Sequence, residues 1–200
     1  GTFDWVYEEE LDLRDGFRWS PNGEFIAFWQ IDTSGMRRFP LVNTEVRPYP
    51  DVQFIPWPKV GERNPICRVG IIRVATGETK WINLPGDQRD NYVARIDWRG
   101  NSNDLLVQQL NRRQDTNRLY LASFDRPDAR EFFVEHDAAW VDIHDELFWL
   151  PGAAHFTWIS ERDGWRHVYV AGVDGSLKQV TRGKFDVIKL LTITMNAGAT

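Results

Sequence analysis

Three consecutive glutamates at positions 8–10 are the residues of this sequence best suited to chemistry, and they close the segment DWVYEEE of residues 4–10. Taken alone, such an acidic run is a solvated patch at the start of a short helix, where carboxylates interact favourably with the positive end of the helix dipole. The residues before the glutamates change this interpretation. Asp4 can cap the turn, while Trp5 and Tyr7 supply apolar surface that can dock it against the rest of the protein.

A docked turn would hold neighbouring carboxylates in fixed directions, and such carboxylates repel one another unless a cation lies between them. The α-ammonium group of a peptide is a suitable cation, with an ordinary pKa of about 8. Each charge-assisted hydrogen bond to it contributes about 1.5–3 kcal/mol when desolvated. The segment therefore predicts a clamp that distinguishes the amino end of a peptide from an internal peptide bond.

The rest of the sequence shows no motif for catalysis. A nucleophile elbow requires Gly-x-Ser-x-Gly, and the nearest segment, GNSND at 100–104, lacks the second glycine. The four histidines have no metal-ligand spacing, and there is neither a phosphate-binding loop nor a dinucleotide fingerprint. We therefore expect no catalytic residue, no metal and no other cofactor in this chain. The single cysteine, Cys67, lies in an apolar run and is predicted to be a buried, inert thiol.

The charge distribution argues against two classes of partner. The chain has 29 acidic and 24 basic residues, for a net charge of −5, and its basic residues form no block that would favour nucleic acid. No run approaches the roughly 18 apolar residues of a membrane span. The chain begins with Gly1 rather than Met, so we expect it to be a piece of a longer protein, and the lack of a signal peptide decides nothing about the compartment.

The elements that must position the acidic segment are predicted to be strands. Aromatic residues make up 14% of the chain, which is typical of strand-rich proteins. Short apolar runs alternate with polar residues and are separated by Gly, Asn and Asp, a pattern that predicts strands. The predicted strands include 25–31, 69–74, 79–84, 105–110, 119–124, 131–134, 155–159 and 167–171.

A repeat organises these strands. Segments 17–23, 94–101 and 146–152 each place an aromatic-rich strand before a polar turn, and the last two begin about 50 residues apart, a period typical of propeller blades. An insertion near residues 33–65 lengthens the first unit. We therefore expect an all-β chain that forms part of one β-propeller, although a β-sandwich stays open as an alternative. The expected boundaries are an acidic segment at 1–16, blades at about 17–84, 93–134 and 145–181, and the start of a further blade at 184–195.

The segment DWVYEEE resembles the motif of dipeptidyl peptidase IV and its relatives, which are serine peptidases with an eight-bladed propeller and a separate α/β-hydrolase domain. Three later segments resemble the same family in the same order: FRWSPNG at 17–23, IPWPKVGERNP at 55–65 and TWISERDGWRHVY at 157–169. The matches extend from about residue 4 to residue 189. The chain therefore resembles three to four blades of that propeller.

The resemblance implies that Glu9 and Glu10 hold the free amino terminus of a peptide substrate and set a dipeptide register, whereas Glu8 faces solvent or supports the turn. The residues supporting the turn would be Asp4, Trp5 and Tyr7. It also implies that the catalytic triad lies in an α/β-hydrolase domain outside this chain. The parent protein would then be a serine-type dipeptidyl peptidase, and this chain alone would be inactive.

The resemblance allows a homodimer of the parent protein and implies a periplasmic or extracellular location. Two departures stand out: Leu11 follows the glutamates where animal relatives soon have a small polar residue, and an aromatic-arginine pair of the family has no counterpart near 140–145. Two alternative functions stay open. They are a non-catalytic interaction propeller and a relative that releases tripeptides.

Overall fold

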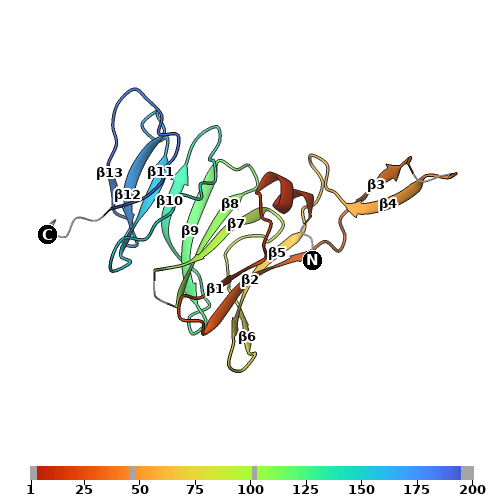
Figure 1. Cartoon of the computed structure of the whole chain (residues 1–200), viewed down its shortest axis with the longest axis horizontal. Coiled ribbons are helices and arrows are strands. Elements are labelled where there is room, and N and C mark those ends of the chain that lie inside the picture. Colours follow the sequence, from red (N-terminus) through yellow and green to blue (C-terminus); the bar gives the residue numbers. More distant parts are fainter. Residues whose placement is uncertain (1–3, 46–47, 101–102, 195–200) are drawn as a thin grey trace.

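The computed structural model describes residues 4–45, 48–100 and 103–194. Antiparallel strands dominate it, and its one helical element is a short π-helical turn, η1 (Val6–Glu10), within these described residues. Three blade-like sheets follow one another along the chain, and a two-stranded hairpin projects from them (Figure 1). The predicted fold class is confirmed: the chain is all-β and forms part of a β-propeller.

The first sheet has the strand order β1-β2-β5-β6. It contains β1 (Phe17–Trp19), β2 (Phe25–Asp32), β5 (Ile66–Arg73) and β6 (Thr79–Trp81). Alternate residues of β2 are buried, which places one of its faces against the core, as its period-two pattern predicted.

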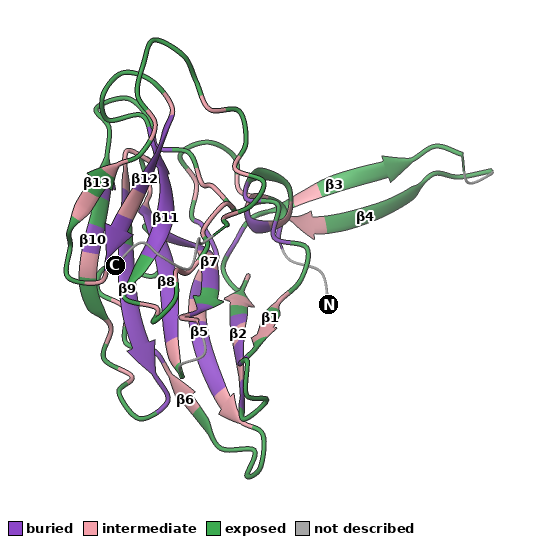
Figure 2. Ribbon diagram, turned by 60° about the vertical axis from the view of Figure 1, so that its left-hand side comes forward, coloured by how far each residue is buried: buried purple, intermediate pink, exposed green. Residues whose placement is uncertain are grey.

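The predicted insertion is a hairpin between β2 and β5. Its strands, β3 (Arg38–Asn43) and β4 (Asp51–Pro56), pair only with each other. We call residues 38–56 the hairpin arm. Most of its described residues are exposed, and it extends away from the sheets (Figure 2).

The second sheet has the order β10-β9-β8-β7. It contains β7 (Asn91–Trp98), β8 (Asp104–Asn111), β9 (Thr116–Ser123) and β10 (Arg130–His136). Six consecutive residues of β8 are buried, because this sheet is covered on both faces. The opening that we predicted at 94–101 coincides with β7 up to Trp98, and its residue 101 lies outside the described residues.

The third sheet contains β11 (His155–Ser160), β12 (His167–Gly172) and β13 (Leu177–Gln179). Its predicted opening strand at 146–152 is reduced to one bridge, between Trp149 and Phe156. The hydroxyl of Thr157 donates to the Glu146 carbonyl and accepts from the Phe148 N–H, both at 2.9 Å. One side chain thus takes two backbone groups that a regular ladder would have paired.

The expected start of a further blade at 184–195 contains no strand in its described part, which ends at residue 194; residue 195 lies outside the described residues. Its backbone groups bind Arg166 instead. The Val187 N–H donates to the Arg166 carbonyl at 2.7 Å, and the guanidinium of Arg166 donates to the carbonyls of Val187 and Ile188.

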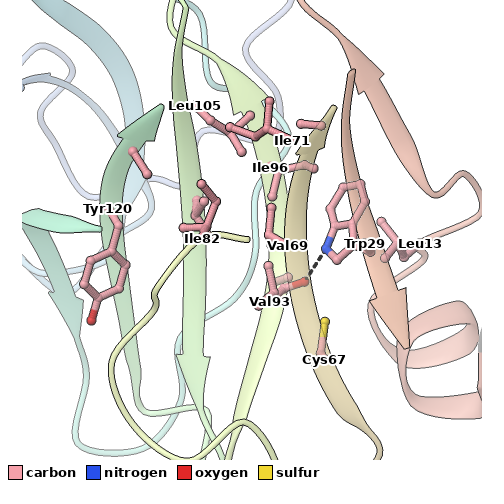
Figure 3. Close-up of a cluster of buried hydrophobic side chains, with 14 of the residues drawn as sticks. Leu13, Trp29, Cys67, Val69, Ile71, Ile82, Val93, Ile96, Leu105 and Tyr120 are labelled. Atoms are coloured by element: carbon pink, nitrogen blue, oxygen red, sulfur yellow. Dashed lines mark hydrogen bonds between the residues drawn. The ribbon is translucent and has the colours of Figure 1, made fainter. Parts of the chain in front are cut away.

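Two buried apolar clusters join the three sheets. The larger cluster packs the first sheet against the second and includes Trp29, Ile71 and Ile96 (Figure 3). The smaller cluster packs the second sheet against the third. Leu105 belongs to the larger cluster and the adjacent Leu106 to the smaller, so successive residues of β8 serve opposite faces.

Candidate functional site

The acidic segment, residues 4–14, folds as one turn followed by an irregular tail, in which Asp12 has a φ of +50°. The Asp4 carboxylate accepts from the Tyr7 N–H at 3.3 Å, and its backbone carbonyl accepts from the Glu8 N–H at 3.0 Å. Further along, the Leu13 N–H donates to the Tyr7 carbonyl at 2.8 Å. Asp4 therefore caps the turn.

One side of this segment is buried. The Tyr7 side chain is 1% exposed, and its hydroxyl accepts from the Val93 N–H of β7 at 3.3 Å. Leu11 and Leu13 belong to the larger apolar cluster, and Figure 3 shows Leu13 beside Trp29. Burial raises the pKa of Tyr7 well above its ordinary value, so the hydroxyl stays protonated. Cys67 lies in the same cluster, and burial raises its pKa to about 12, so the thiol is un-ionised at neutral pH.

Trp5 docks on a different surface. Its ring stacks on Trp57, with centroids 3.9 Å apart and planes 15° apart. Trp57 follows β4 directly, and its N–H donates to the Arg37 carbonyl at 3.1 Å, closing the base of the hairpin arm. Trp5 therefore contacts the base of the arm and stays partly exposed.

The glutamates lie on the open side of the turn. Glu9 and Glu10 are exposed, and Glu8 is partly buried. The guanidinium of Arg14 lies 3.4 Å from Glu8 and 3.3 Å from Glu9, and it also pairs with Asp12 at 3.0 Å. The sequence predicted a cation between neighbouring carboxylates, and within the chain Arg14 takes that position. The Glu10 carboxylate has no hydrogen bond or ion pair to any other described residue.

The glutamates border two hollows rather than one. Glu8 and Glu9 line the first together with Asp4 and Thr33. Glu10 lines the second, whose other walls include Trp57, Lys59 and Arg112. Trp5 borders both hollows. The structure thus brings Glu8 and Glu9 to one surface, while Glu10 lies beside the tryptophan stack.

The carboxyl group of Asp4 is buried beneath the first hollow. Burial raises the pKa of this group, against hydrogen bonds from the backbone that lower it. Its Oδ2 atom has no hydrogen-bond partner among the described residues. Asp4 is therefore the least well satisfied polar group of the segment.

Sequence reasoning missed two arginines of this site. Arg14 carried a weak signal, since it is a lone basic residue soon after an acidic run. Arg95 carried none, because it lies in a strand 84 positions from the residue it binds. Its Nη1 donates to the Leu11 carbonyl at 2.7 Å, and its Nε donates to Asp145 at 2.5 Å.

Asp145 belongs to a long connection, residues 137–154, between the second and third sheets. His144 in this connection lies 3.2 Å from the Arg166 guanidinium. Burial, and next the charge of Arg166, lower the pKa of His144, so this imidazole is neutral at neutral pH and accepts from the arginine. No group of His, Cys, Asp and Glu among the described residues has the arrangement of a metal site. No helix in the described ranges is long and apolar enough to cross a membrane.

The fold and this segment define a class of protein: a partial β-propeller carrying a short acidic turn that is docked by its apolar side and open on its acidic side. The chain matches the family model "Dipeptidyl peptidase IV (DPP IV) N-terminal region" over residues 1–198, and it belongs to that family.

Individual relatives agree with this assignment. The crystal structure of dipeptidyl peptidase 4 from Porphyromonas gingivalis superposes with a TM-score of 0.87 at 31% identity, covering 94% of this chain and 27% of that one. Human prolyl endopeptidase FAP is 26% identical over 98% of this chain and 28% of its own length. Dipeptidyl peptidase 4 from Trichophyton rubrum is 25% identical over 96% of this chain and 27% of its own length. The chain thus spans little more than a quarter of the length of these relatives.

Proposed function

We propose that this chain is the substrate-binding propeller portion of a serine-type dipeptidyl aminopeptidase, in which Glu9 and Glu10 hold the free amino terminus of a peptide. One observation carries the proposal: the segment is fixed by a buried side that includes Tyr7 and Leu11, while its acidic side stays open. A docked turn with accessible carboxylates suits recognition of a small cation, because little backbone freedom is lost on binding.

The contacts of Arg14 are compatible with this role. Its guanidinium meets Glu8 and Glu9 at 3.3–3.4 Å, and its side chain is 55% exposed. Ion pairs at such exposed positions contribute little to stability. An α-ammonium group carries three donors and makes shorter hydrogen bonds. The substrate can therefore take over the carboxylate of Glu9 while Arg14 keeps its contact with Asp12.

The proposed role is binding rather than bond breaking. Holding the amino terminus at a fixed distance from a nucleophile selects which peptide bond reacts. Acyl transfer by a serine triad would take place on a hydrolase domain of the parent protein. We expect the 200-residue chain alone to hydrolyse no peptide.

Family membership alone does not decide the register of cleavage, since one relative is named a dipeptidyl peptidase and another a prolyl endopeptidase. A glutamate clamp should make turnover depend on a free amino terminus. This dependence separates the proposed function from an endopeptidase or a non-catalytic propeller.

The test replaces Glu9 or Glu10 by Gln in the full-length protein, with Glu8→Gln as the matched control. We expect Glu9→Gln and Glu10→Gln to weaken the binding of dipeptidyl substrates by about 2–5 kcal/mol, as for other charges that hold a desolvated partner. Glu8→Gln should change binding far less. Steady-state kinetics on substrates with free and acetylated amino termini provide the measurement, and equal turnover of both substrates would refute the clamp.

A further inference from the structure

Strand β7 has an irregularity where it meets the acidic segment. Val93 pairs with Gln109 and Arg95 pairs with Gln108, so Ala94 is an extra residue in the ladder. Both backbone groups of Val93 bind side chains from earlier in the chain: its N–H donates to the Tyr7 hydroxyl at 3.3 Å, and its carbonyl accepts from the Trp29 indole at 3.0 Å (Figure 3). Bulges of this kind often redirect side chains beside functional sites.

Arg95 leaves the strand directly after this bulge, and its guanidinium contacts two parts of the chain. Nη1 donates to the carbonyl of Leu11 at 2.7 Å. Nε and Nη2 donate to the two carboxylate oxygens of Asp145, at 2.5 and 3.3 Å. The Arg95 side chain is 16% exposed and its contact with Leu11 is partly buried, whereas Asp145 is 72% exposed and its ion pair with Arg95 lies at the surface. One side chain thus joins the acidic segment to the connection at 137–154.

The contact with Leu11 lies where η1 ends. Leu11 directly follows Glu10, and the last carbonyls of a helical turn have no partner within the turn and carry a partial negative charge. The guanidinium satisfies one of these carbonyls and fixes the backbone next to Glu10. A lysine would supply the charge but not the planar fork that binds both oxygens of Asp145.

We propose that Arg95 is a positioning residue for the substrate's amino terminus: it holds the end of the glutamate turn and couples it to the connection at 137–154 through Asp145. This inference rests on the proposed function. Arg95 touches neither Glu9 nor Glu10 through any hydrogen bond in the described structure, and it acts through the backbone of Leu11.

The experiment uses the full-length enzyme and substrates with a free amino terminus. We expect Arg95→Met to raise KM by about tenfold or more while kcat changes less than about twofold, because a displaced clamp weakens binding without touching the reacting atoms. Arg95→Lys should recover part of the loss through its contact with Leu11. Asp145→Asn should raise KM by a smaller factor. In the Arg95→Met background it should have almost no further effect, because the two residues act as one unit.

Arg99 provides a matched control. Its guanidinium also joins the second sheet to the connection at 137–154, with Nε 2.7 Å from the Ala153 carbonyl and an ion pair to Asp104 at 3.1 Å. These contacts lie away from the acidic segment. Arg99→Met should therefore lower the thermal midpoint about as much as Arg95→Met while leaving KM unchanged.

The outcomes separate this inference from the proposed function. If Glu9→Gln raises KM and Arg95→Met does not, the positioning role is wrong and the clamp stands. If Arg95→Met and Arg99→Met raise KM equally, the effect is a general loss of structure and the inference fails. If neither glutamate variant changes KM, the proposed function fails. Hydrogen exchange of residues 4–14 would still show whether Arg95 holds the turn, because only Arg95→Met should then raise its exchange rate.

Discussion

The acidic segment and the hairpin arm both leave the sheets, yet they are held in opposite ways. The arm has six paired residues on each strand, but its apolar side chains face solvent, with Val42 57% and Phe54 52% exposed. The acidic segment has only one irregular turn, but Tyr7 is 1% and Leu13 2% exposed. Regular backbone hydrogen bonds hold the arm as a hairpin, whereas buried side chains fix the acidic segment against the sheets. A two-stranded hairpin without a packed face is marginally stable on its own.

The two regions meet at one place. Trp57, at the base of the arm, stacks on Trp5 and also lies 5.4 Å from the Phe39 ring, centroid to centroid. This aromatic group is where the exposed arm meets the docked segment. We therefore expect substitutions of buried residues in the acidic segment to have large effects on local stability, and matched substitutions in the arm to have small ones.

The largest effect is expected at Tyr7. Replacing it by Ala removes a buried ring and the acceptor for the Val93 N–H, so residues 4–14 should open more easily by about 3–5 kcal/mol. Hydrogen exchange of this segment in the full-length protein measures the change. Phe54→Ala in the arm removes an exposed ring and should alter exchange in the sheets very little. Equal effects of the two substitutions would contradict the contrast between a docked and an undocked region.

A smaller effect concerns the pH dependence of docking. Burial raises the pKa of Asp4 in the docked segment above the value of the free side chain, about 3.9. The protonated form therefore favours docking: this contribution is complete below pH of about 4 and is lost as the pH rises through the raised pKa. The protection of residues 4–14 from hydrogen exchange, corrected for the intrinsic exchange rate at each pH, should fall as the pH rises from about 4 through the raised pKa of Asp4. Asp4→Asn should abolish the trend, and an unchanged slope in this variant would assign it to another group.

Local patterns predicted much of the fold, because strands with one buried face alternate visibly. The predicted strand at 167–171 corresponds to β12 (His167–Gly172), and the predicted burial of Cys67 is confirmed. The opening at 146–152 was wrong as a regular strand. Two backbone hydrogen bonds still join it to β11, but the Thr157 hydroxyl binds the Glu146 carbonyl and the Phe148 N–H in place of the backbone. A period-two pattern of apolar residues does not predict where a side chain will replace the backbone as a hydrogen-bond partner.

The candidate site was predictable only in part. The motif indicated which face of the turn would be acidic, and Asp4 caps that turn as expected. The stack of Trp5 on Trp57 and the bond from Arg95 to Leu11 join residues far apart in the sequence. Such contacts depend on how the sheets and the arm are placed, which spacing along the chain does not encode. The roles of Glu9 and Glu10 as substrate ligands stay predictions.

The smallest expected effect concerns Arg14, which lies on the open side of the acidic segment. Arg14 is the one cation that meets Glu8 and Glu9 in the described structure, and it is as exposed as residues of the arm. If it competes with the substrate ammonium, Arg14→Met should lower KM for free amino termini by less than about fivefold, consistent with a weak surface ion pair. The gain should shrink at high salt, because screening already weakens the competing pair. Arg113→Met, which removes another exposed arginine paired with Asp115, is the matched control and should leave KM unchanged. A rise in KM for Arg14→Met would instead show that Arg14 orients the carboxylates. The acidic side of the segment would then be held in place as well as its buried side.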